Sequence, residues 1–282
     1  MDEFGYYKHG DLSPEALAAM RRAMDSGVRQ INDFTVSFVS RQRPLGSGTL
    51  VRAGDRHAIL TAFHVAKVLQ ERDEPVGVIV SDRDHQLFIE PLGFDFISVG
   101  EPANRKHPEL GPDLAVLRIL DLPRLAILTS KKSFYRLDGR SFNEWKNRPI
   151  EQMPWWIAGA PAELARSIGE IDTAKHILAA THFHAEATLV AMEERQGFDF
   201  AELQVTAGSH SFPSDYGGVS GGGIWLAPLQ MDPDIGPTSI TPASPLLAGV
   251  AFYQGALQNG HRAIIGHGPQ SVYERAATAL GS

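Results

Sequence analysis

The feature that most constrains the fold is a succession of short β-prone runs, separated by turns rich in glycine and proline, from residue 31 onward. Valine, isoleucine and aromatic residues favour strands, whereas glycine and proline interrupt them. Many short strands with such turns are typical of sandwiches and barrels rather than of alternating strands and helices. The fold class is therefore predicted to be all-β. The expected strands cover residues 35–41, 48–52, 57–61, 76–80, 86–90 and 114–119 in a first block, and 155–158, 181–192, 200–205, 222–225 and 246–253 in a second block.

One helix is expected near each end of the chain. Residues 13–24 are rich in alanine and methionine, with Ser13 as the N-cap, Pro14 at the first helical position and Gly27 just beyond the end. Residues 271–280 are the second expected helix. Residues 228–245, which contain many prolines and glycines, are expected to form a long surface loop.

The composition excludes several classes of protein. The formal net charge is −7 and the basic residues are scattered, which argues against a nucleic-acid partner. The chain has no cysteine, so disulfides, zinc–thiolate sites and a thiol nucleophile are excluded. No run approaches the roughly 18 apolar residues that a membrane span needs, and no secretory signal is visible at the N-terminus. We therefore expect a cytoplasmic protein with no membrane partner.

Three separated motifs carry residues suited to nucleophilic catalysis. Ser220 lies in a glycine-rich run at residues 218–223, His64 follows an expected strand, and Asp113 precedes one. Glycine neighbours let the backbone turn tightly and expose the serine hydroxyl and its N–H. A serine hydroxyl is a weak nucleophile at neutral pH and needs an adjacent base, which an imidazole can supply. A buried carboxylate would hold that imidazole in the required tautomer.

Each motif alone has a more ordinary interpretation: a structural histidine, a turn aspartate and a flexible glycine loop. Together, in the order His, Asp, Ser, they resemble the chymotrypsin/trypsin-like serine peptidase family in its bacterial, disulfide-free form. The motifs that carry the resemblance are LTAFH at 60–64, DLAVL at 113–117 and GVSGG at 218–222, with GSG at 46–48 and GVAFY at 249–253 in matching places.

The resemblance implies two packed six-stranded antiparallel β-barrels with an added N-terminal helix and a C-terminal helix. The implied segments are a helical extension at 1–30, a first barrel at 31–125, a connection at 126–149, and a second barrel with the C-terminal helix at 150–282.

The resemblance also implies a trypsin-like serine endopeptidase that hydrolyses peptide bonds through an acyl-enzyme. Ser220 would be the nucleophile, His64 the general base and acid, and Asp113 the group that orients His64. The N–H groups of Gly218 and Ser220 would form the oxyanion hole. No cofactor and no metal ion are expected, and the expected partner is a protein or peptide substrate.

Two positions depart from the pattern of the family. Digestive and clotting members have an aspartate before the serine, which pairs with a new N-terminus after zymogen cleavage, whereas this chain has Val219. A valine cannot pair with an ammonium, so we expect an enzyme that is competent without N-terminal insertion. The family often places a serine beside the buried aspartate, and Phe252 stands at the corresponding position. The support of Asp113 is therefore left open.

Four residues are expected at the substrate-binding cleft by the same resemblance. Ser214 corresponds to the floor of the specificity pocket and Asp215 lies next to it, while Tyr253 and Gln254 would line its wall. A buried Asp215 would select lysine or arginine side chains by charge pairing, but the Pro-Ser-Asp-Tyr context favours a turn residue.

Other interpretations remain open in the sequence. The run GVSGG also satisfies the nucleophile elbow of lipases, although that motif needs a helix after the serine and a histidine downstream of it. His182 and His184 would share one face of a strand, with His176 nearby, which is a spacing that can bind zinc. Finally, the chain could be a non-catalytic binding module, or an enzyme that a protein partner activates through the N-terminal extension.

Overall fold

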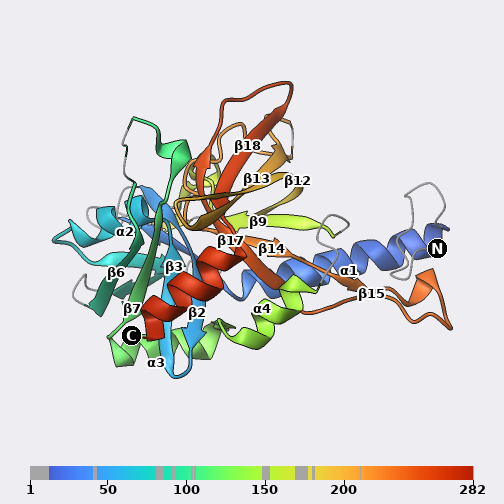
Figure 1. Cartoon of the computed structure of the whole chain (residues 1–282), viewed down its shortest axis with the longest axis horizontal. Coiled ribbons are helices and arrows are strands. Elements are labelled where there is room, and N and C mark those ends of the chain that lie inside the picture. The colour runs from blue at the N-terminus through green and yellow to red at the C-terminus, as the bar shows by residue number, and fades with distance from the viewer. Residues whose placement is uncertain are drawn as a thin grey trace.

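The computed structural model describes residues 13–40, 43–80, 86–89, 93–102, 104, 106–147, 153–168, 177–179, 182–209 and 211–281. Parts of three expected strands, at residues 41, 90 and 181, lie outside these ranges, as does His176. The molecule contains two β-structures packed against each other, with one long helix that extends away from them (Figure 1).

The first β-structure is an almost entirely antiparallel sheet with the strand order β5-β4-β1-β2-β3-β7-β6. Its two outermost strands, β5 and β6, are consecutive in the chain, since β5 ends at Ile89 and β6 begins at Phe94. The two edges of the sheet are therefore connected by a short stretch of sequence. If β5 and β6 are counted as one strand position, the strand order is that of a six-stranded barrel, as predicted. The strands are β1 (Thr35–Val39), β2 (Pro44–Ala53), β3 (Arg56–Thr61), β4 (Val76–Ile79), β5 (Gln86–Ile89), β6 (Phe94–Gly100) and β7 (Leu114–Ile119).

The second β-structure is a closed six-stranded barrel, also as predicted. Its hydrogen-bonded order is β12-β13-β18-β17-β14-β9, and closure leaves no unpaired edge strand. The strands are β9 (Trp155–Gly159), β12 (Phe183–Arg195), β13 (Phe198–Thr206), β14 (Gly223–Leu226), β17 (Leu246–Gln254) and β18 (His261–His267). Two small hairpin sheets accompany it, β10 (Arg166–Ile168) with β11 (Ile177–Ala179) and β15 (Leu229–Gln230) with β16 (Thr241–Pro242).

Apolar side chains join the two β-structures into one packed unit. Phe198, Phe200 and Phe252 of the second barrel belong to the same buried cluster as Val36 and Leu117 of the first sheet. The hydrophobic effect favours this arrangement because each barrel buries an apolar face against the other. The interface matters for function because Asp113 lies at the edge of it, next to the second barrel.

Two long strands of the main β-structures, β6 and β18, were not predicted from the sequence. β6 and β18 are interrupted by polar residues or glycine, such as Asp95, Ser98 and Gly266, which reduce the strand signal. In the tertiary structure each has neighbours that supply its backbone partners: β6 pairs with β7, and β18 pairs with both β13 and β17.

The N-terminal helix α1 (Pro14–Asn32) is longer than predicted. Its N-cap is correct, since the Ser13 hydroxyl accepts the N–H of Ala16 at 3.2 Å. The expected end near Gly27 is wrong, because the helix continues to Asn32. Gly27 is buried there, and a Cβ at this position would lie 3.6 Å from that of Ala227. A small residue inside the helix therefore serves close packing instead of ending the helix.

The segment between the barrels and the expected surface loop are both more structured than predicted. Residues 126–149 include most of α3 (Leu122–Lys131), strand β8 (Tyr135–Arg136) and α4 (Gly139–Lys146), and β8 joins β2 in parallel. Residues 228–245 contain the β15–β16 hairpin, which lies along α1 (Figure 1). The C-terminal helix, predicted at 271–280, is confirmed as a π-helical turn (Ser271–Ala276) followed by α5 (Ala277–Gly281).

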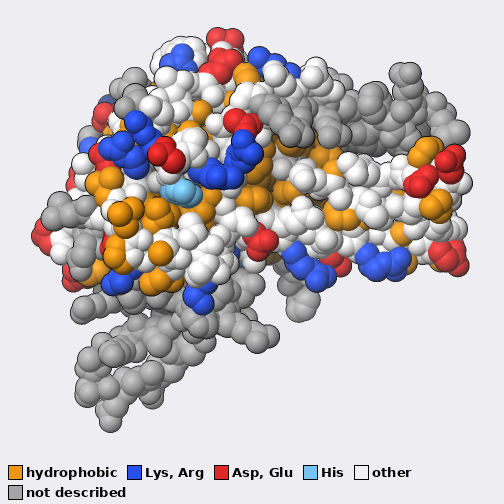
Figure 2. Space-filling model, turned by 90° about the horizontal axis from the view of Figure 1, so that it is seen from below, with side chains coloured by type: hydrophobic (Ala, Val, Ile, Leu, Met, Phe, Trp, Pro, Cys, Tyr) orange, Lys and Arg blue, Asp and Glu red, His pale blue; other side chains and the backbone are white. Residues whose placement is uncertain are grey.

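Figure 2 shows one face on which basic and acidic side chains are interspersed with apolar ones. None of the helices in the described ranges combines the length and the apolar character that crossing a bilayer requires.

Candidate active site

His64 is positioned by the first turn of helix α2 (Phe63–Gln70), directly after β3. Its neighbours Phe63, Val65 and Ala66 are buried and fix this turn against the first sheet. The His64 side chain itself is 48% exposed. The local sequence therefore holds the backbone of the histidine firmly and leaves one edge of its ring open to solvent.

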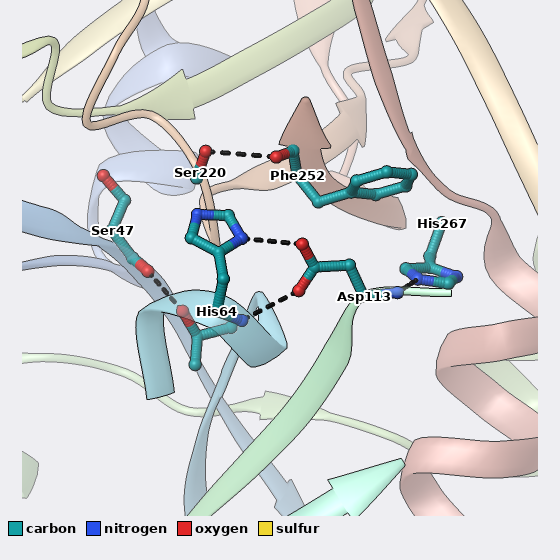
Figure 3. Close-up of polar contacts among 7 residues, drawn as sticks. Ser47, His64, Asp113, Ser220, Phe252 and His267 are labelled. Carbon is teal, nitrogen blue, oxygen red and sulfur yellow. Dashed lines mark hydrogen bonds and ion pairs between the residues drawn. The ribbon is translucent and has the colours of Figure 1, made fainter. Parts of the chain in front are cut away.

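Asp113 holds His64 through both of its carboxylate oxygens. Oδ2 of Asp113 lies 2.6 Å from Nδ1 of His64, and Oδ1 accepts the His64 backbone N–H at 2.9 Å (Figure 3). The Asp113 side chain is 4% exposed, so water competes little for these contacts. An ionised carboxylate only accepts hydrogen bonds, so the proton of a neutral His64 ring lies on Nδ1. Nε2 is then free to act as a base.

A second histidine contacts Asp113 from the other barrel. His267, the last residue of β18, is fully buried, and its Nε2 accepts the backbone N–H of Asp113 at 2.9 Å. The sequence analysis missed this residue, since a histidine at the end of an unrecognised strand carries no local signal. The open question about Asp113 is answered by geometry: the main chain of Asp113 is held by His267 and its carboxylate by His64.

Hydrogen bonding differs between neighbouring N–H groups of the loop that carries Ser220. Val219 N–H donates to the Tyr216 carbonyl at 3.0 Å and Gly221 N–H to the Ala251 carbonyl at 2.7 Å. In the part of the chain that the structure describes, the N–H groups of Gly218 and Ser220 have no acceptor. These are the two groups expected to form the oxyanion hole, and they are available to an incoming oxygen.

Ser47 on β2 ties the nucleophile loop to the first barrel. Its N–H donates to the Ser220 carbonyl at 2.8 Å, and its hydroxyl donates to the Gly218 carbonyl at 2.7 Å. The same hydroxyl accepts the Ala160 N–H at 2.9 Å, while the Thr61 hydroxyl donates to the Ser47 carbonyl at 2.7 Å. Residues 46–48 were matched only as a motif, and the role of Ser47 was not predicted. One serine thus orients the carbonyls on both sides of Val219.

Glycine is required at the two positions after Ser220 because neighbouring atoms leave no space for a side chain. A Cβ on Gly221 would overlap the Thr61 hydroxyl and the Ser47 carbonyl, and one on Gly222 would overlap the Ala158 carbonyl. Gly221 also has a φ of 88°, which side chains rarely adopt. The run is therefore a tightly packed turn and not a flexible loop. The strand β14 follows it, not a helix, which removes the lipase-type interpretation.

The hydroxyl of Ser220 is not hydrogen-bonded to His64 in this structure. It donates instead to the carbonyl of Phe252 at 3.3 Å (Figure 3). Ser220, His64 and Asp113 nevertheless line the same open cavity, whose volume is about 740 Å³. The structure thus brings the three predicted residues together, with the hydroxyl turned toward the neighbouring strand.

Two of the four predicted substrate-binding residues line this cavity and two do not. The full lining is Phe63, His64, Lys67, Val68, Glu71, Glu101, Pro102, Pro108, Asp113, Ser220, Phe252, Tyr253 and Gln254. Ser214 and Asp215 are exposed and lie outside it. Charge pairing with a substrate lysine or arginine would need a buried carboxylate, and Asp215 is exposed.

Asp215 has the geometry of a turn residue. Its Oδ1 accepts the side-chain amide of Gln254 at 2.5 Å and the N–H of Gly217, two residues on, at 2.6 Å. The hydrogen bond from Gln254 lowers the pKa of Asp215. Gln254 also accepts the Tyr216 N–H at 2.9 Å. Gln254 therefore links the turn before Ser220 to strand β17.

His182 and His184 are not part of a recognisable metal site within the described part of the chain. Burial lowers the pKa of His182 to about 3 and that of His184 to about 4, in each case with a contribution from the nearby Lys132 ammonium. Nδ1 of His182 lies 2.8 Å from the side-chain oxygen of Asn32. Among the described residues, no three histidine, aspartate or glutamate side chains are grouped as metal ligands would be. His176 lies outside those residues.

Comparison with known proteins gives structural neighbours only. No family model and no curated protein matches the sequence. Neuropsin, a serine protease expressed in the limbic system of mouse brain, has a TM-score of 0.45 at 15% identity, over 88% of this chain and 95% of its own. The serine endoprotease from Yersinia pestis has a TM-score of 0.49 at 16% identity, over 92% and 66%. Kallikrein-related peptidase 10 has a TM-score of 0.47 at 12% identity, over 88% and 95%.

The fold follows from the strand topology of this chain. Two barrels, each with six strand positions, pack face to face. The first barrel supplies His64 and Asp113, and the second supplies Ser220. The chain has the chymotrypsin/trypsin-like fold. The identities are low and each TM-score is below 0.5, so these neighbours do not assign an activity to this chain.

Proposed function

We propose that this protein is a serine endopeptidase with Ser220 as the nucleophile, His64 as the general base and acid, and Asp113 as the residue that orients His64. The observation that carries the proposal is the two-point contact of Asp113 with His64, at 2.6 and 2.9 Å, beside Ser220 in one cavity. A buried carboxylate that holds an exposed imidazole by its ring and its backbone is what a general base next to a serine requires.

In the proposed reaction, the Ser220 hydroxyl rotates from the Phe252 carbonyl toward Nε2 of His64. Its Oγ attacks the carbonyl carbon of the peptide bond as Nε2 takes the proton, and the negative oxygen binds at the N–H groups of Gly218 and Ser220. His64 then gives the proton to the leaving amine, which leaves an acyl-enzyme on Ser220. Water, deprotonated by His64, hydrolyses the ester and restores the serine.

The proposed peptidase needs no N-terminus newly released by zymogen cleavage for its activity. Val219, before the nucleophile, is 3% exposed and packs in the core of the second barrel. The carbonyl groups on either side of it are held by Ser47. Contacts already present in this chain therefore fix the loop. In zymogen-type enzymes, an ion pair with the new N-terminus has this role.

A second candidate function is a peptidase-fold module that binds proteins or peptides, or that becomes active only with a partner. The hydrogen bond from Ser220 to the Phe252 carbonyl favours it, because a hydroxyl held there is not poised on His64. In the endopeptidase, by contrast, the hydroxyl would turn to His64 only when substrate binds, as catalytic hydrogen bonds are often long or misaligned beforehand.

Labelling with a fluorophosphonate probe separates the candidates. For the endopeptidase, the purified protein becomes covalently modified on Ser220, and Ser220→Ala and His64→Ala abolish the labelling. Folded wild-type protein that stays unmodified would overturn the endopeptidase proposal. Labelling only after addition of cell extract would replace it with a partner-activated enzyme. A peptide-library cleavage profile, with Ser220→Ala as the control, then gives the substrate preference.

A further inference from the structure

The main-chain N–H of Asp113 lies outside the regular hydrogen bonding of the sheet. The ladder of β7 with β6 ends at the pair Leu114 and Gly100, and its ladder with β3 ends at Ala115 and Thr61. Asp113 precedes both ends, so its N–H needs an acceptor from elsewhere. Nε2 of His267, from the opposite barrel, provides it at 2.9 Å.

The contact determines the protonation of His267. Nε2 can accept a hydrogen bond only through its lone pair, so the proton of the ring lies on Nδ1 and the ring is neutral. Three phenylalanine rings surround it, with centroids 5.0 Å (Phe200), 5.1 Å (Phe252) and 5.4 Å (Phe198) from the imidazole.

The charges around His267 agree with a neutral ring. Burial lowers the pKa of His267 to about 3; the Asp113 carboxylate opposes this shift and Arg195 adds to it. The Arg195 guanidinium carbon lies 4.4 Å from the centroid of the Phe200 ring. Asp199, which precedes Phe200 on β13, accepts hydrogen bonds from the hydroxyl and N–H of Ser271 and from the N–H of Gln270. A second cation next to Asp113 would compete with the imidazolium that forms on His64, and a neutral His267 avoids this competition.

We propose that His267 is a positioning residue for the proposed peptidase reaction, in which its neutral imidazole holds the backbone of Asp113 so that both carboxylate oxygens face His64. The inference rests on the proposed function. Removal of the acceptor frees the Asp113 N–H in a dry site, and the residue shifts to find another partner. The carboxylate then loses its alignment with Nδ1 of His64.

The test compares three variants. His267→Gln keeps an acceptor oxygen within reach of the Asp113 N–H, whereas His267→Leu removes it. Phe198→Leu is the matched control, because it disturbs the same buried cluster without touching the Asp113 N–H. We expect His267→Leu to lower kcat/KM per labelled serine by about 100-fold, the cost of misplacing a catalytic group by about 1 Å.

The pH profile distinguishes positioning from a merely structural role. In His267→Leu, His64 loses part of the negative charge that stabilises its imidazolium, so the acid limb of the kcat/KM profile moves to lower pH. His267→Gln is expected to restore the wild-type limb, and Phe198→Leu is expected to lower thermal stability without moving it. A folded His267→Leu variant with an unchanged acid limb overturns the proposal, as does a His267→Gln variant that behaves like His267→Leu.

A readout without catalysis keeps this inference separate from the proposed function. In a Ser220→Ala background, ¹⁵N NMR of the imidazoles reports protonation directly. We expect His267 Nε2 to show the signal of an unprotonated nitrogen from about pH 5 to about pH 9. We also expect the hydrogen-bonded signal of the His64 Nδ1 proton to be lost in the added His267→Leu variant, because the Asp113 carboxylate is no longer aligned with it. A protonated Nε2 on His267, or an unchanged signal of the His64 Nδ1 proton, contradicts the positioning role even if the protein cleaves no peptide.

Discussion

At the scale of single residues, the site depends on Asp113 and its contacts with two histidines. Asp113 contacts the ring and the backbone of His64 through its two oxygens, while its own backbone is held by His267. Because all of these contacts are sheltered from water, a change to one of them is not compensated by solvent. The chemistry of the site is therefore expected to respond strongly to conservative substitutions.

Replacement of Asp113 by asparagine tests this expectation. The amide is neutral and can donate to Nδ1 of His64, which would favour the tautomer with its proton on Nε2. We expect kcat to fall by about 10⁴-fold, as for the equivalent change in a serine–histidine–aspartate triad. The rate of fluorophosphonate labelling measures the effect. Asp73→Asn makes the same chemical change at an exposed position and should label at the wild-type rate. A labelling loss below tenfold in Asp113→Asn would contradict the role of Asp113.

Ser47 offers a second prediction for a single side chain. Ser47→Ala removes the hydroxyl that donates to the Gly218 carbonyl and accepts the Ala160 N–H. The free energy of unfolding should fall by about 1–3 kcal/mol, since buried polar groups lose their partner. kcat/KM should also fall, because the loop that presents the Gly218 N–H is loosened.

The matched control for Ser47 is Ser37→Ala on the adjacent strand β1. The Ser37 hydroxyl is also buried, but it has no hydrogen-bond partner in the described part of the chain. Its removal should leave both stability and kcat/KM almost unchanged. Equal effects of the two substitutions, measured by chemical denaturation and peptide cleavage, would show that Ser47 does not organise the loop.

At the scale of elements, the turn between residues 218 and 223 is shaped by strands of both barrels. β2 supplies Ser47, β3 supplies Thr61, and β9 supplies the Ala158 carbonyl that lies against Gly222. Tight turns of this kind need glycine for space as well as for backbone conformation. The two requirements can be separated by experiment.

Gly221→Ala and Gly236→Ala form a matched pair for this purpose. Both glycines have positive φ, 88° and 79°, but only at Gly221 would a Cβ meet neighbouring atoms. Gly236 has a ψ of −157°, which together with its positive φ places it in a region that almost only glycine adopts. We expect Gly236→Ala to cost about 1–3 kcal/mol of stability from backbone strain, with normal labelling of Ser220. Gly221→Ala should abolish labelling and lower the melting temperature much further. Normal labelling of Gly221→Ala would mean that the turn is looser than the structure shows.

At the scale of the whole molecule, three buried neutral histidines make stability depend on pH. Burial lowers the pKa of His182 and His267 to about 3 and that of His184 to about 4, below the value of 6.5 for an unperturbed histidine. A group with a lowered folded pKa stabilises the fold above its unfolded pKa. That contribution is lost as the pH falls, because the unfolded chain then binds the proton more readily.

We therefore expect the free energy of unfolding to fall between about pH 6.5 and pH 4. Each buried histidine contributes at most about 1.4 kcal/mol per pH unit in this range. Urea denaturation at several pH values measures the slope. His184→Gln should reduce the slope by the share of one proton, whereas the exposed His261→Gln should leave it unchanged. An unchanged slope in His184→Gln would show that His184 binds its proton equally in the folded and unfolded protein, which contradicts its lowered pKa.

Local signals were sufficient for the all-β class, most strands and the three residues of the proposed triad. His64, Asp113 and Ser220 each lie in a motif that has an ordinary interpretation alone, and their order along the chain made them candidates together. β6 and β18 could not be predicted, because polar residues and glycine weaken their pattern while their pairing partners lie far away in the chain. The end of α1 was misplaced for the same reason, since Gly27 is packed against Ala227 from the other end of the chain.

The amino-acid order alone determined which groups are available for chemistry: a serine among glycines, a histidine after a strand, an aspartate before one, and no thiol. Tertiary structure decided how they are held. Ser47 at the nucleophile loop, His267 behind Asp113 and the orientation of the Ser220 hydroxyl toward Phe252 are contacts between distant segments. Hydrogen bonds across a packed interface depend on where two barrels meet, and no local pattern encodes that distance.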